Sequence, residues 1–231
     1  MKAARDDLGE APRSLRLQAY EAIKQGILDS RYAPGALLSE NQLAEELQIS
    51  RTPIREALRE LAGGGLVRIL PQRGIVVSDL SVQDIIEVYQ LREQLEGFAA
   101  RVAAEHLGPA DAEALRADHR AAQAHRKAGR LRQAYNASVL MHDRIIRLAG
   151  NARLGQFMAQ LSDQVHRFGL LTLRHGRVEP ALREHGLIID ALVEGKAEEA
   201  DRLMRVHLRA DRDLALRIVL PAGVQMAEAT P

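Results

Sequence analysis

The segment from Ile49 to Val77 changes its periodicity within a few residues, and this change constrains the fold more than any other feature. Its first half, ISRTPIREALRELAGGG, places apolar residues on one helical face and ends in three glycines. Its second half, LVRILPQRGIVV, consists of two β-rich runs around a turn that contains Pro71 and Gly74. The pattern predicts a helix followed directly by a small β-hairpin.

Two more helices are expected before this segment. Helical periodicity begins near Leu15 and breaks near Pro34, and a short helix follows that Ser39 can cap. Thr52 is expected to cap the third helix, because Pro53 suits the first helical position and favours extended backbone in the residue before it. Three helices followed by a hairpin predict a winged helix-turn-helix, whose third helix enters the major groove of DNA.

Candidate DNA contacts gather at the two tips of this motif. A guanidinium group can pair with O6 and N7 of guanine, while hydroxyls and free helix amides suit phosphates. The predicted contacts are Ser50, Arg51, Thr52, Arg55, Arg73 and Gly74. The stretch 51–73 carries five arginines against two glutamates, although the formal net charge of the whole chain is only +1. This local excess favours a phosphate-contacting patch, and the alternative is an ordinary solvated face.

The remainder of the chain has a helical pattern. Helices are expected from Ser81 to about residue 107 and then over about 110–128, 131–149, 152–175, 180–194 and 196–219, with glycines near their ends. The sequence therefore predicts a mainly α protein. A winged helix-turn-helix domain would occupy residues 14–78, and a bundle of about six helices would occupy residues 81–220.

Composition excludes several classes of site. The chain has no cysteine, so disulfides, thiolate nucleophiles and cysteine-ligated zinc are ruled out. The N-terminal segment is charged and lacks the apolar core of a signal peptide, and the longest apolar runs are too short to span a bilayer. We therefore expect a cytoplasmic protein without membrane contact.

Three of the eight histidines stand apart from the others. His142, His185 and His207 share apolar helical stripes and are predicted to point into the bundle, where inward side chains on facing helices can hold a divalent metal. Histidines 106, 119, 125, 166 and 175 are interpreted as ordinary surface or core residues. Because histidine-bound metals can activate water, a metal-dependent hydrolase is an alternative, although HExxH, GxSxG and GxGxxG motifs are absent.

The sequence also resembles a known family. PGALLSENQLAEELQISRTPIREALRELAGGGLV resembles the N-terminal signature of the GntR family of bacterial transcription regulators, and PQRGIVVSDLS resembles its wing. VYQLREQLEGFAARVAA and EHGLIIDALVEGKAEEADRLMRVHL resemble the start and end of the helical, FCD-type ligand-binding domain of the FadR subfamily. The resemblance implies a homodimeric regulator, with repression favoured, that binds an inverted-repeat operator and responds to a small organic acid or similar metabolite.

The resemblance implies roles for individual residues at the DNA face. Arg51 and Arg55 would read bases, and Ser50, Thr52 and Arg73 would be further contacts. Asn41 occupies a contact position on the second helix where relatives can carry arginine.

The resemblance also implies a metal. Many FadR-subfamily regulators bind one with three histidines and an aspartate, and His142, His185 and His207 match the three histidine positions. The aspartate position, one turn before the first histidine, holds Ser138, and Asp143 lies about 100° around the helix. A three-histidine set completed by effector or water is expected, with zinc first and nickel or manganese as alternatives.

An effector carboxylate would need a cation or a polar partner. Arg92 and Arg174 are candidates, because guanidinium groups pair with carboxylates through two hydrogen bonds, and Ser138 joins them as an effector-facing hydroxyl. Two alternatives remain open. The arginines could form structural ion pairs, or the helical domain could serve only for dimerisation.

Overall fold

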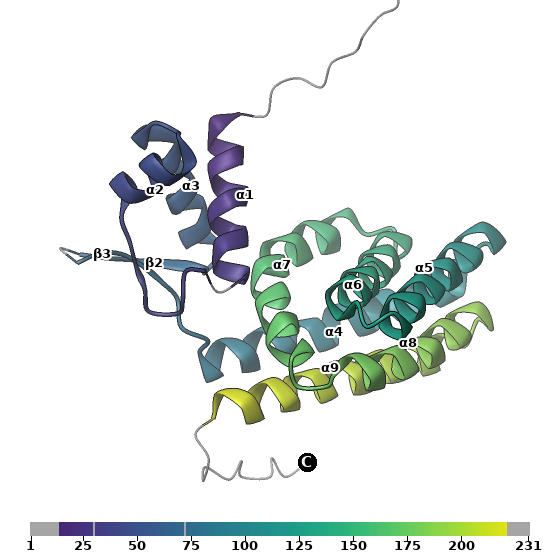
Figure 1. Ribbon diagram of the computed structural model, residues 1–231. Coiled ribbons are helices and arrows are strands. Elements are labelled where there is room, and N and C mark those ends of the chain that lie inside the picture. Colours follow the sequence, from purple (N-terminus) through teal and green to yellow (C-terminus); the bar gives the residue numbers. More distant parts are fainter. Residues whose placement is uncertain (1–13, 30, 72, 221–231) are drawn as a thin grey trace, which may run out of the picture. The chain divides into compact units, whose positions relative to one another are not determined.

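The computed structural model describes residues 14–29, 31–71 and 73–220. The chain divides between Asp79 and Leu80 into two compact units (Figure 1). The charged N-terminal segment, residues 1–13, lies outside the described part.

The first unit begins with helices that are capped by serines. Its elements are α1 (Leu15–Leu28), β1 (Leu37–Leu38), α2 (Glu40–Leu47), α3 (Arg51–Gly63), β2 (Val67–Leu70) and β3 (Gly74–Val77). Ser14 Oγ accepts the Leu17 amide at the start of α1. Ser39 Oγ accepts the Gln42 amide at the start of α2, as predicted. Each bond satisfies one of the amides that a helix start leaves unpaired.

The start of α3 differs from the prediction. We expected Thr52 as the cap and Pro53 as the first helical residue, and this is wrong: the helix begins at Arg51, and Ser50 occupies the cap position with extended backbone. Pro53 is tolerated as the third residue because the first four amides of a helix have no intrahelical acceptor, so its missing N–H costs nothing.

A three-stranded antiparallel sheet completes the first unit within its described residues, in the order β1-β3-β2. Val67 pairs with Val77 and Leu70 with Gly74, which forms the predicted hairpin. Leu37 of β1 pairs with Val76 on the other side of β3. Sequence periodicity could not reveal β1, because two residues are too few to show an alternating pattern.

The apolar face of α3 packs against α1 and the sheet to form the core of this unit. Ile54, Leu58 and Leu61, the three residues assigned to that face, are fully buried. Ile23 of α1 and Leu66, just before β2, are fully buried in the same cluster. The buried face fixes the rotation of α3, and its polar residues are therefore turned outward.

The second unit consists of helices joined by short turns in its described residues, 80–220. Its elements are α4 (Val82–His106), α5 (Pro109–Lys127), α6 (Leu131–Leu148), α7 (Ala152–Leu173), α8 (Val178–Val193) and α9 (Ala197–Val219). The long helices α4 and α9 run alongside each other (Figure 1). The predicted fold class, mainly α with an N-terminal winged helix-turn-helix and a C-terminal helical bundle of six helices, is confirmed.

Four helices of the second unit end shortly before a glycine. Gly129, Gly150, Gly176 and Gly195 all have positive φ angles between +66° and +81° just after a helix or in the turn that follows it. Such a conformation is strained for other residues, so these positions stop each helix. In the described residues, no helix combines the length and apolar character that crossing a membrane requires.

Leu58→Ala tests whether the α3 face holds the first unit together. The side chain is fully buried, so its truncation leaves a cavity and should cost about 2–5 kcal/mol of unfolding free energy. Urea unfolding of the full chain, followed by circular dichroism, measures the loss. Glu56→Ala, an exposed change on the same helix, is the control and should leave the midpoint nearly unchanged. Equal effects of the two substitutions would contradict this account of the core.

Candidate functional site

The predicted DNA-contact residues all lie on the surface of the first unit. These exposed residues are Asn41, Ser50, Arg51, Thr52, Arg55, Arg73 and Gly74. They come from the start of α2, the start of α3 and the turn between β2 and β3. None of them is taken up by the core of the unit, so they are available to a ligand.

The β2–β3 turn depends on glycine at one position. Gly74 has a φ angle of +95°, and a Cβ there would lie 3.2 Å from Leu37 Cδ1. The Arg73 amide donates to the Leu70 carbonyl at 3.2 Å, which closes the turn. Another residue at position 74 would be strained and crowded, so the turn that presents Arg73 requires this glycine.

Sequence reasoning missed one residue of this surface. Glu40, the first residue of α2, accepts hydrogen bonds from Arg55 Nε at 3.0 and 3.1 Å and from Arg55 Nη2 at 2.8 Å. Its Oε2 also lies 3.8 Å from Arg51 Nη2. An acidic residue directly after a serine cap was the available signal, but it is also an ordinary helix-start preference.

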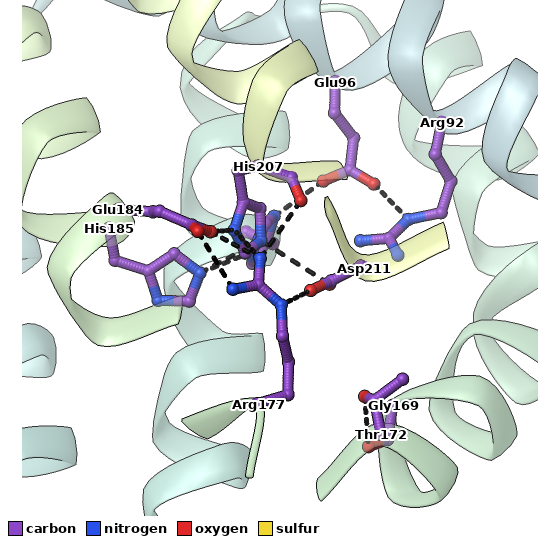
Figure 2. Close-up of polar contacts among 10 residues, drawn as sticks. Arg92, Glu96, Gly169, Thr172, Arg177, Glu184, His185, His207 and Asp211 are labelled. Atoms are coloured by element: carbon purple, nitrogen blue, oxygen red, sulfur yellow. Dashed lines mark hydrogen bonds and ion pairs between the residues drawn. The ribbon is translucent and has the colours of Figure 1, made fainter. Parts of the chain in front are cut away.

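In the second unit, three imidazoles meet as predicted. His142 comes from α6, His185 from α8 and His207 from α9. Figure 2 shows His185 and His207 close together. His185 Nε2 lies 3.3 Å from His142 Nε2 and 3.2 Å from His207 Nε2. His185 and His207 are buried, and 12% of the His142 side chain is exposed.

Two carboxylates fix the orientation of two of these rings. His142 Nδ1 lies 2.7 Å from Glu96 Oε2, and His207 Nδ1 lies 2.7 Å from Glu184 Oε2. A neutral imidazole that donates its Nδ1–H to a carboxylate carries a lone pair on Nε2. Both rings therefore direct a lone pair toward His185.

The three Nε2 atoms cannot all be satisfied by hydrogen bonds to one another. His185 has a single ring proton when neutral, and this proton can serve only one of the two facing lone pairs at a time. Burial, together with His207 and His142, lowers the pKa of His185 well below its usual range, so a second proton is disfavoured. A cation bonded to all three nitrogens would resolve this mismatch.

The spacing of the donor set suits a metal ion. The ligand atoms of the three histidines all lie within 4.8 Å of one another. Zinc binds imidazole nitrogen at about 2.0–2.1 Å, and in a tetrahedral site this places neighbouring ligand atoms about 3.4 Å apart. The observed separations of 3.2 and 3.3 Å are close to that value. The residues present therefore fit a divalent metal.

Charged side chains around the histidines, buried or partly buried, add up to a negative excess. Arg92 Nε donates to Glu96 at 2.6 Å, and Arg177 is bonded to Glu184 and Asp211 (Figure 2). Two guanidinium groups thus face three carboxylates. With neutral imidazoles, the cluster is one negative charge in excess, which favours a bound cation.

Glu96 and Glu184 of this cluster stay ionised. Burial would raise the pKa of Glu96, but Arg92 and His142 outweigh it and lower the pKa to about 2. Burial would likewise raise the pKa of Glu184, and hydrogen bonds from His207 and Arg177 lower it to about 2. The negative excess therefore persists at neutral pH.

The predicted effector residues lie in different surroundings. Arg92 is buried in its pair with Glu96, whereas Arg174 is exposed at the end of α7. Ser138 is half-buried, and its hydroxyl donates to the Ala134 carbonyl at 3.1 Å. Arg177, which sequence reasoning did not select, is the guanidinium that lies beside His207, 3.2 Å from its carbonyl.

Comparison with known proteins identifies the family. The model of bacterial regulatory proteins, gntR family, matches residues 15–77, and the FCD domain model matches residues 87–210. The chain belongs to the GntR family. It carries the FCD type of helical domain, and members of this family are transcriptional regulators rather than enzymes, which sets aside the hydrolase alternative.

Individual relatives agree with this assignment. An uncharacterised HTH-type transcriptional regulator in an unstable DNA locus of Streptomyces ambofaciens is 35% identical, over 89% of this chain and 87% of the relative. The probable D-xylose utilization operon transcriptional repressor of Paenarthrobacter nicotinovorans is 32% identical, over 84% and 85%. The fold matches that of E. coli McbR/YncC with a TM-score of 0.74 at 23% identity, over 88% of this chain and 98% of that one.

The charged residues around the three histidines of this GntR-family chain do not stand out in the hydrophobic periodicity of the sequence. Glu96, Glu184, Arg177 and Asp211 are charged residues on helices that also carry apolar stripes, and a search for apolar stripes passes over them. Two spacings were available as signals: Glu96 follows Arg92 by four residues, and Asp211 follows His207 by four.

Glu96→Gln tests the buried charge balance of this GntR-family protein. The side chain is only 2% exposed, and its loss of charge leaves Arg92 buried without its anionic partner. We expect the unfolding free energy to fall by about 3–5 kcal/mol, measured by urea unfolding. Glu113→Gln removes the same charge from the exposed pair with Arg120 and should leave the midpoint unchanged. A neutral result for Glu96→Gln would show that this pair does not determine stability.

Proposed function

We propose that this GntR-family regulator is a metal-containing, metabolite-controlled repressor that binds an inverted-repeat operator as a homodimer in the bacterial cytoplasm. Residues 14–78 bind DNA, and residues 81–220 bind the effector and dimerise. The observation that carries the effector half of the proposal is the convergence of three Nε2 atoms in a negatively charged interior. Repression is supported by the Paenarthrobacter relative, which is named a probable D-xylose utilization operon transcriptional repressor.

Base reading is assigned to the arginines at the start of α3. Arg51 and Arg55 are exposed and lie in the first two turns, the part of a recognition helix that reaches base edges. Ser50, Thr52 and Arg73 make further contacts, and the unhindered backbone at Gly74 allows close approach to the duplex. Asn41, exposed near the start of α2, is an additional contact.

We expect a homodimer because the proposed inverted-repeat operator presents two equivalent half-sites. Two copies of α3 that read an inverted repeat require a two-fold axis in the protein, and the half-site spacing then reflects the geometry of the dimer. Size measurement of the full chain in solution tests this part separately from DNA binding.

Zinc is the metal we favour, with nickel and manganese as alternatives. His142, His185 and His207 would hold it through Nε2, while Glu96 and Glu184 fix the rings through Nδ1. Bound there, the metal supplies a Lewis-acidic position for an anionic ligand. Ser138 stands where the family resemblance implies an aspartate, so water or the effector would complete the metal site.

An organic-acid effector is supported by the charge of the cluster. The metal-free cluster has a negative excess and should repel a carboxylate, whereas a divalent ion changes the sign to positive. Arg92 and Arg174 stay predicted effector contacts, although the bond between Arg92 and Glu96 favours a structural role for Arg92. Release of DNA requires that the effector bind the DNA-free and DNA-bound states with different affinity.

Replacing His142, His185 and His207 together by alanine tests the metal. The variant should contain no metal, because the donor nitrogens are gone, while the dimer persists; elemental analysis and gel filtration measure both. His185→Gln, a milder change, guards against a folding defect of the triple variant. Replacing the exposed His106 and His175 is the control and should leave the metal content unchanged. Wild-type protein isolated with less than about a tenth of an equivalent of metal would count against the site.

Arg51→Ala tests base reading. The substitution should cost about 1–3 kcal/mol on the operator and relax preference at one base position, because a two-point contact to a base is lost. Genomic footprinting of the native protein supplies the operator, and fluorescence anisotropy with base-substituted duplexes measures the preference. Equal weakening on every sequence would show that Arg51 contacts only the backbone.

A further inference from the structure

Glu40 lies among the arginines of the DNA-contact surface, where an acidic side chain should oppose phosphate. Its side chain is only 23% exposed, whereas the side chains of Arg55 and Arg51 are 46% and 60% exposed. The hydrogen bond from Arg55 lowers the pKa of Glu40 below its usual range, so the carboxylate stays charged. An acid in this position needs an explanation beyond solubility.

The contacts use one particular edge of the Arg55 guanidinium. Its Nε and Nη2 donate to Glu40 at 2.8 to 3.1 Å. The other edge is formed by Nη1 and the second hydrogen of Nη2. That edge carries two parallel N–H donors, and guanine O6 and N7 can accept one hydrogen bond from each of them. Glu40 therefore holds Arg55 by one edge in a way that leaves a base-reading edge unused by the pair.

Glu40 itself is held in place by the start of α2. It is the first helical residue after Ser39, whose hydroxyl accepts the Gln42 amide. The carboxylate position is thus set by a capped helix rather than by a loop. Arg55 in turn is anchored by α3, whose neighbouring Ile54 is fully buried. Both partners of the pair start from rigid backbone, which limits the directions that the guanidinium can take.

The same carboxylate also reduces attraction to arbitrary DNA. Non-specific binding depends on positive side chains that neutralise phosphates and release counterions. Glu40 offsets part of the charge of Arg55 and, at 3.8 Å, of Arg51. A duplex that offers only phosphates must compete with this carboxylate, whereas a guanine can be contacted without breaking the pair.

We propose that Glu40 is a specificity-determining residue of this regulator: it orients Arg55 for a base and weakens binding to duplexes that lack that base. The inference rests on the base-reading roles proposed for Arg51 and Arg55. Glu40 acts through Arg55 and is a positioning residue, so its effect should appear in base preference and not only in affinity.

The test uses the full chain and a library of randomised double-stranded DNA. Selection yields a preferred duplex, and dissociation constants are then measured on it, on its single-base variants and on an unrelated duplex at several salt concentrations. Glu40→Gln should strengthen binding to the unrelated duplex by about 3- to 10-fold. The slope of log affinity against log salt concentration should become steeper by about the amount that one additional phosphate contact gives. Affinity for the preferred duplex should rise less. The ratio of the affinity for the preferred duplex to the affinity for the unrelated duplex should therefore fall by about 5-fold or more.

Glu46→Gln is the matched control. Glu46 lies on the same helix and pairs with Arg31 at 2.7 Å and with Tyr32 at 2.9 Å, away from the base-reading arginines. The Glu46→Gln substitution removes the same charge from an exposed ion pair, so any general electrostatic gain in affinity should be equal for all duplexes. The ratio of the affinities for the preferred and the unrelated duplex should therefore stay constant. A Glu40→Gln result that matches Glu46→Gln would overturn the inference.

Arg55→Ala separates this inference from the proposed function. Loss of base preference in Arg55→Ala alone supports base reading, and adding Glu40→Gln to it should then change no base preference further. A further change of preference in the double variant would mean that Glu40 acts without Arg55, contrary to the proposal. Unchanged base preference in Arg55→Ala would overturn the reading role of Arg55 itself. Circular dichroism of each variant verifies that the fold is kept.

Discussion

Three imidazole nitrogens meet among side chains that carry more negative than positive charge, and the polar interior of the second unit is arranged around this one constraint. Glu96 and Glu184 fix the protons of His142 and His207 on the far side of each ring, so the near sides can be satisfied only by a shared proton or a cation. A divalent ion satisfies all three nitrogens and reverses the sign of the cluster. If the site holds a metal, as we propose, anion binding would follow metal binding, and the metal would be a condition for the proposed regulation.

The two units share one arrangement of a carboxylate with a planar nitrogen group. In each, a carboxylate binds one edge of a planar nitrogen group and leaves the other edge directed elsewhere. Glu40 holds the Nε edge of Arg55, and Glu96 holds the Nδ1 edge of His142. A planar group with one fixed edge loses less freedom when the other edge binds. The ligands would differ, a base edge in the first case and a metal in the second, but the physical role of the carboxylate is the same.

Prediction from sequence succeeded where periodicity is long and failed where structure depends on few residues. The helices and the burial of Ile54, Leu58 and Leu61 could be predicted, because each rests on a repeated apolar stripe. The stripes also predicted that three histidines converge. They could not reveal β1, which has two residues, or the partners of charged side chains, which depend on tertiary distances. Arg177 was missed for the same reason that Arg174 was chosen, since sequence alone does not show which of two nearby arginines is buried.

The histidines come from three different helices, and the chain between them is long. His142 and His185 are 43 residues apart, and His185 and His207 are 22 residues apart. A metal joining them would act as a reversible cross-link that closes two loops and penalises the unfolded chain more than the folded one. Metal availability in the cell would then affect the lifetime of the regulator against proteolysis, in addition to the proposed response to a metabolite.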